Sequence, residues 1–128
     1  MKYMNILMLM CLLSLSSCVQ PREPSKEQVS SKIQIRDYAS IDENGLRGGV
    51  DSKVSVGYQF VIPNTDKYRE EVRAIDPTIR FVGSPFLFCK SNRELLCVGD
   101  TYKKDYRRIL RQLAELSYVT SINDQWLE

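Results

Sequence analysis

The sequence predicts an α+β fold in which two helices cover one face of an antiparallel sheet. Residues 54–62 alternate apolar and polar side chains, as a strand with one buried face does. Residues 102–116 carry apolar side chains at steps of three and four, which is typical of an amphipathic helix. The chain has 128 residues, which is enough for one small folded domain. We expect this domain to occupy residues 53–128.

The predicted domain begins with a strand followed by a helix. The strand's apolar positions are Val54, Val56, Tyr58, Phe60 and Ile62. Pro63 ends the strand because proline cannot donate to the ladder. Asn64 or Thr65 is expected to cap the helix. The helix presents Tyr68, Val72 and Ile75 on one face and ends at Asp76, before Pro77.

A hairpin is expected next. Residues 79–82 and 85–89 look extended, 94–98 form a second extended run, and 91–93 form the turn. With the turn centred near Arg93, Cys89 lies directly opposite Cys97. Cross-strand neighbours have Cβ atoms about 4.5–5.5 Å apart, so a disulfide needs only a modest adjustment.

The second helix is expected to start after a cap at Asp100 or Thr101. Its apolar stripe consists of Tyr102, Tyr106, Ile109, Leu110, Leu113 and Leu116. Residues 118–122 form a last short strand, and Trp126 and Leu127 are expected to dock on the core.

The element order is therefore βαββαβ, the ferredoxin-like arrangement. It leaves one sheet face open. Either Phe86 with Phe88 or Leu87 with Cys89 must lie on that face as a partner surface, unless other side chains cover it. The candidates for this cover are Ile33, Ile35 and Trp126.

The N-terminus carries a targeting signal in residues 1–17. Lys2 precedes an apolar run from Ile6 to Leu15, which is too short to span a bilayer. The run closes on Leu15-Ser16-Ser17-Cys18 and resembles a bacterial lipoprotein signal with its lipobox. The resemblance implies cleavage before Cys18 and acylation of its sulfur and amine. Val19, in place of Asp, implies the outer membrane, facing the periplasm, in a Gram-negative host. Ordinary secretion with an incidental Cys18 is the alternative.

Residues 18–52 are expected to be a lipidated tether and a flexible loop. Residues 19–31 are rich in Pro, Ser, Glu and Lys and have little to bury, which is typical of disorder. A short edge strand is possible over 33–38, and Asn44-Gly45 and Gly48-Gly49 break the chain into a loop.

The cysteines and the absence of histidine limit the chemistry. Cys89 and Cys97 form an even pair in an oxidising compartment, so a disulfide is expected. A redox or metal role is the alternative, but their spacing is not C-x-x-C, and two thiolates make a poor zinc site. Without histidine, neither a Ser-His-Asp triad nor the common zinc-hydrolase ligand sets can form. We expect no cofactor, no metal and no catalytic activity; a serine or carboxylate enzyme stays open.

Basic residues on the second helix are the candidate partner-binding site: Lys103, Lys104, Arg107, Arg108 and Arg111. Such a ridge suits anionic lipid headgroups or an acidic partner. The alternative is a solvated helix face, partly compensated by Asp105 and Glu115. Nucleic acid is not an expected partner outside the cytoplasm.

The sequence thus predicts a membrane-anchored envelope lipoprotein that is a non-catalytic binding or accessory module for another envelope protein. A periplasmic inhibitor or exclusion lipoprotein is one alternative. Peptidoglycan binding is another, because a strand ending Cys97-Val98-Gly99 before a helix resembles the SPOR domain. That resemblance is confined to architecture, and Gln59 is out of register with the family's usual Gln.

Overall fold

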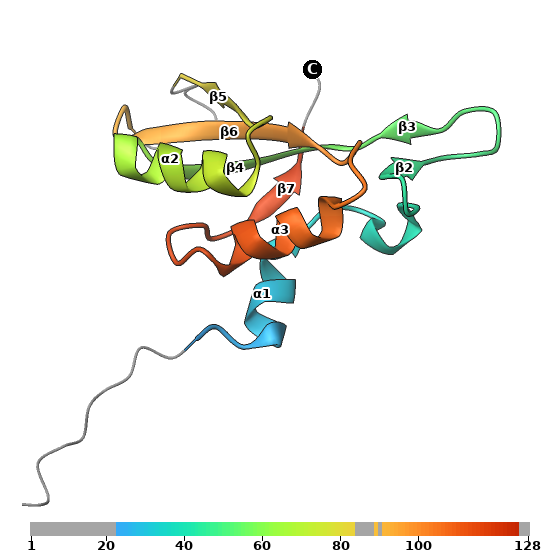
Figure 1. Cartoon of the computed structure of the whole chain (residues 1–128), viewed down its shortest axis with the longest axis horizontal. Coiled ribbons are helices and arrows are strands. Elements are labelled where there is room, and N and C mark those ends of the chain that lie inside the picture. Colours follow the sequence, from blue (N-terminus) through green and yellow to red (C-terminus); the bar gives the residue numbers. More distant parts are fainter. Residues whose placement is uncertain (1–22, 84–88, 90, 126–128) are drawn as a thin grey trace, which may run out of the picture.

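The structure, a computed structural model, describes residues 23–83, 89 and 91–125 (Figure 1). It is a mixed α+β fold with a mostly antiparallel five-stranded sheet in the order β1-β7-β4-β6-β5. The elements are α1 (Lys26–Lys32), β1 (Ile33–Gln34), the 3-10 helix η1 (Tyr38–Ser40), β2 (Leu46–Arg47), β3 (Val54–Ser55), β4 (Gly57–Pro63), α2 (Asp66–Ile75), β5 (Arg80–Val82), β6 (Glu94–Asp100), α3 (Tyr106–Glu115) and β7 (Ile122–Asp124).

The sheet differs from the expected one at its β7 edge. The predicted alternation of strand, helix, strand, strand, helix and strand is present from β4 to β7. A further strand, β1, pairs with β7 in parallel, with Ile33 opposite Ile122. It pairs the outer edge of β7, which would otherwise expose free backbone groups. A separate antiparallel ribbon of β2 and β3 extends to one side of the body (Figure 1).

The main core lies between the sheet and the helices. Tyr58, Phe60 and Ile62 of β4 are at most 2% exposed and pack with Leu110 and Leu113 of α3. Their alternation along β4 confirms the predicted buried face. The prediction fails at Val54, which lies in β3 rather than β4 and is 60% exposed.

The two predicted helices differ in how well the sequence located them. Thr65 caps α2, as predicted, and its hydroxyl accepts from the Tyr68 N–H. The start of α3 was predicted a turn too early. Thr101 is fully buried; its hydroxyl donates to the Gly45 carbonyl and accepts from the Val56 N–H, so it joins loop to strand instead of capping a helix.

The predicted disordered tether is wrong over residues 26–31, which form most of α1. Ser25 and Gln28 form a reciprocal capping box that satisfies the first backbone donors of this helix. Val29 is 6% exposed and joins the main core. The folded part of the chain therefore begins well before residue 53. The helix was missed because it is held by the burial of Val29 and by its capping box, and its sequence shows little periodicity.

We expect Gly45→Ala to lower the free energy of unfolding by about 3 kcal/mol. Gly45 has a φ of +78°, and a Cβ there would lie 1.5 Å from the carbonyl oxygen of Thr101. Urea unfolding followed by circular dichroism measures the loss. Gly49→Ala is the matched control, since its Cβ would meet only the Ser52 hydroxyl at 3.4 Å. Equal losses in both variants would contradict the argument.

Candidate functional site

A groove lies where β4 runs past the end of β7. β6 pairs with all of β4 from Gly57 to Pro63, but β7 pairs only with Tyr58 and Gln59. The Gln125 N–H donates to the Gly57 carbonyl, so the odd-numbered residues of β4 turn their backbone groups toward β7. Among the described residues, no backbone hydrogen bond joins Val61 to the 116–121 loop. The N–H and C=O of Val61 therefore form a short open strand edge.

The groove beside this edge has a volume of about 410 Å³ and a mainly uncharged lining. Amide and hydroxyl side chains come from both walls: Gln59, Thr120, Ser121 and Asn123. Val61, Pro63 and Leu96 add apolar surface, and Arg93 and Glu94 supply one charge of each sign. Such a lining suits an extended, uncharged ligand that offers both hydrogen-bonding groups and apolar side chains.

Tyr118 forms a fixed wall of the groove. Its hydroxyl donates to Glu71 Oε2 at 2.6 Å, and its ring lies 4.3 Å, centroid to centroid, from that of Tyr68. Burial and then the bond to the Glu71 carboxylate raise the pKa of Tyr118, so the phenol stays protonated. A wall held in this way loses little conformational freedom when a ligand binds.

The open sheet face carries a small apolar cluster. Cys89, Leu96 and Val98 are buried there, with Val61 packed against them. The predicted cover by Ile33 and Ile35 is wrong, because Ile35 is buried in the main core and Ile33 packs against it. Phe86, Leu87, Phe88 and Trp126 lie outside the described residues.

The cysteines are not placed as the predicted hairpin requires. The residue opposite Cys97 is Phe81 of β5, not Cys89; residues 85–88 of the predicted hairpin lie outside the described residues. Cys97 belongs to the main core, whereas Cys89 packs with Leu96 and Val98 on the other sheet face. Both are free thiols in the structure. Burial raises the pKa of Cys97 to about 12.

We expect the Cys97 thiol to resist alkylation in the native chain. With its pKa near 12, the thiolate fraction at pH 8 is roughly a thousandth of that of a free cysteine. Mass spectrometry after iodoacetamide treatment measures this, and both thiols should react once guanidinium unfolds the unreduced chain. If neither Cys89 nor Cys97 is alkylated in the unfolded, unreduced chain, the two form a disulfide. That result would contradict the placement of two free thiols.

One of the five predicted basic residues, Lys103, is separated from the other four. Lys103 precedes α3 and pairs with Asp76, where both side chains are largely buried. Lys104, Arg107, Arg108 and Arg111 are exposed. Arg108 pairs with Asp105 at 3.0 Å, and Arg111 lies 4.0 Å from Glu115. The residue that the sequence grouped with its neighbours, Lys103, thus stabilises the fold.

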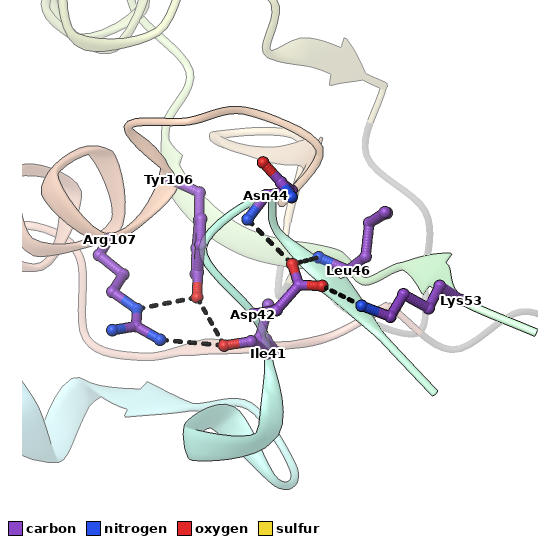
Figure 2. A network of polar contacts seen from close by, with 7 residues as sticks. All are labelled: Ile41, Asp42, Asn44, Leu46, Lys53, Tyr106 and Arg107. Carbon is purple, nitrogen blue, oxygen red and sulfur yellow. Dashed lines mark hydrogen bonds and ion pairs between the residues drawn. The ribbon is translucent and has the colours of Figure 1, made fainter. Parts of the chain in front are cut away.

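Arg107 also contributes to structure, as Figure 2 shows. Its guanidinium donates to the Tyr106 hydroxyl at 2.8 Å and to the Ile41 carbonyl at 2.9 Å. The Tyr106 hydroxyl in turn donates to the same carbonyl at 3.1 Å. These bonds fix the N-terminus of α3 against the chain that follows η1.

The 42–47 loop is held by Asp42 (Figure 2). Asp42 Oδ1 accepts from the N–H groups of Asn44 and Leu46, and Oδ2 pairs with Lys53 at 3.0 Å. The backbone bond from Leu46 and the bond from Lys53 hold the pKa of Asp42 below its ordinary value. The loop was predicted as flexible from its glycines; its Asp-x-Asn-Gly turn signal was the clue to this order.

No helix in the described part of the chain has the length and apolar character needed to cross a bilayer. Nor do its acidic and cysteine side chains gather in a group that could hold a metal ion. No family model, curated protein or solved structure matches this chain.

Proposed function

We propose that this protein is an envelope lipoprotein that binds another envelope protein and carries out no chemistry itself. The lipobox-like run Leu15-Ser16-Ser17-Cys18 supports the anchor, because such a signal directs acyl chains to Cys18. Two or more such chains make a stable membrane anchor. In a Gram-negative host, Val19 directs it to the outer membrane, facing the periplasm.

The fold proposed for the folded body is a ferredoxin-like unit, β4 to β7, enlarged at one edge by β1. The order β7-β4-β6-β5, with antiparallel neighbours throughout, supports this. The fold itself carries no functional weight, since one architecture serves many functions.

The open strand edge at Val61 carries the binding proposal. An extended segment of the partner can pair with the free N–H and C=O of Val61, while its side chains enter the groove between β4 and the 118–121 loop. β4 is paired along its other side by β6, so the edge is rigid before the partner arrives. An inhibitory or exclusion role is a form of the same proposal, because it also requires a bound partner.

Photo-crosslinking in whole cells tests the groove. A photoreactive residue at Thr120, which is exposed on the groove wall, should capture one partner, and the same residue at Ala74 on α2 should not. Val61→Pro removes the free backbone donor on the groove side and should abolish capture while circular dichroism is unchanged. Capture that is equal at both positions, or that survives Val61→Pro in the folded chain, would contradict the proposal.

Peptidoglycan is the second candidate, because hydroxyl and amide side chains beside Tyr118 also suit a glycan chain. Retention of the purified chain on isolated sacculi, lost on Asn123→Ala, would favour it over a protein partner. Charge reversal at Arg107 and Arg111 distinguishes a basic-surface contact from a groove contact, since neither residue lines the groove.

A further inference from the structure

We propose that the exposed cations around α3 and α1 form a membrane-facing surface, which lies against anionic lipid headgroups beside the Cys18 anchor. This basic face consists of Lys26, Lys104, Arg107, Arg108 and Arg111. The inference rests on the proposed lipid anchor and adds an orientation to it. The positive charge of this face and the short chain between Cys18 and α1 both favour a lipid surface.

The positive charge of the chain is concentrated in two segments. Residues 103–115 contain five cations and two anions, and α1 contains two lysines and one glutamate. Residues 33–102 contain nine cations and ten anions. The surplus of positive charge near the domain's helices is therefore a local feature and does not reflect a generally basic protein.

The two segments lie together on the side of the molecule away from the sheet. Figure 1 shows α1 beneath α3, and the Lys32 ammonium donates to the Leu116 carbonyl just beyond α3. Arg108 and Arg111 are exposed, whereas Ile109, Leu110 and Leu113 of the same helix are buried. The arginines thus occupy the solvent side of α3, and α1, which the N-terminal chain enters, packs against the same helix.

The length of chain between anchor and domain limits the possible orientations. Cys18 and Lys26 are eight residues apart in sequence, which spans at most about 28 Å. The anchor therefore keeps the start of α1 close to the bilayer, and this confinement lets weak contacts act at high effective concentration. Each cation near an anionic surface then favours the docked orientation by about fivefold.

The ion pairs on this face do not prevent docking. Arg108–Asp105 and Arg111–Glu115 are exposed pairs, which contribute little to stability and are readily exchanged for other anions. Arg80 lies opposite Val98 and so shares the open sheet face, away from the helices. Docking through the basic face leaves that sheet face available to a partner.

Arginine footprinting on vesicles tests the orientation. The lipidated chain purified from membranes is reconstituted in phosphatidylcholine vesicles with or without about a third phosphatidylglycerol, and its arginines are reacted with phenylglyoxal. Arg108 and Arg111 should react at least about fivefold more slowly with the anionic lipid, and high salt should remove the difference. Arg80 and Arg93, which are also exposed, are internal controls and should not change.

A charge-matched pair of variants locates the effect. Lys26→Gln with Lys104→Gln should remove most of the protection of Arg108 and Arg111, and Lys67→Gln with Arg80→Gln should leave it intact. Equal reactivity in both lipid mixtures, with the chain still floating with the vesicles, overturns this inference alone. A chain that does not float overturns the lipid anchor as well. Protection that needs added envelope protein instead of lipid assigns the face to a protein partner and also overturns the inference.

Discussion

Cys18→Ser should abolish fatty-acid labelling of this protein and release it from the membrane fraction. Serine provides no thiol for the diacylglyceryl group that the resemblance places on the Cys18 sulfur. Each buried CH2 contributes about 0.8 kcal/mol to membrane binding, so losing whole acyl chains changes partitioning completely. Metabolic labelling with an alkynyl fatty acid, followed by fractionation, measures both effects.

Cys11→Ser is the control for this experiment. Cys11 lies within the predicted signal peptide, so the mature chain should be labelled as before. Label that survives Cys18→Ser, or a wild-type chain that takes up none, would remove the anchor from the proposed function and with it the membrane-facing surface.

Elements with a strong local signal were predicted well from the sequence. β4 places Tyr58, Phe60 and Ile62 in the main core, and α3 buries side chains at steps of three and four. Both patterns follow from the geometry of a single element packed on one side. The Thr65 cap of α2 was found for the same reason, because a cap bonds within three residues of itself.

Elements stabilised by distant contacts were missed. α1 has only one buried residue among those described, Val29, and the helix is held in place by its contact with α3. Neither the periodicity nor the composition of this segment therefore reveals the helix. The β5 register failed for a related reason. The sequence predicted two extended runs before β6, and local pattern does not decide which of them pairs with Cys97.

The candidate site was predicted only in part. The groove depends on where β7 stops beside β4, a property of two strands that are separated by about sixty residues of sequence. Four of the five predicted cations are exposed, as expected from a helix face. The fifth, Lys103, looks the same as its neighbours in the sequence, and only the fold reveals that it pairs with Asp76.

We expect Lys103→Ala to lower the free energy of unfolding at neutral pH by about 3 kcal/mol. The Asp76 side chain is 2% exposed; it pairs with Lys103 and accepts from the Thr78 N–H at 2.9 Å and hydroxyl at 2.7 Å. Removing Lys103 leaves a buried carboxylate without its counter-ion. Lys104→Ala removes a neighbouring exposed lysine and should change stability by less than about 0.5 kcal/mol.

The pH dependence of this loss identifies its cause. Burial alone would raise the pKa of Asp76, but the bonds from Lys103 and Thr78 outweigh burial and hold the pKa below its ordinary value. A carboxyl with a lowered folded-state pKa stabilises the fold above its unfolded pKa of about 4, and this contribution is lost as the pH falls through the folded value. In Lys103→Ala only the bonds from Thr78 still oppose the effect of burial, so the pKa of Asp76 rises and its protonation relieves the variant. The difference in unfolding free energy between wild type and Lys103→Ala, measured by urea unfolding, should therefore narrow between pH 7 and about pH 3.

Two outcomes would contradict this account. A difference that stays constant with pH would mean that Lys103 acts through packing of its side chain. Equal losses of stability in Lys103→Ala and Lys104→Ala would mean that the ion pair with Asp76 does not stabilise the fold.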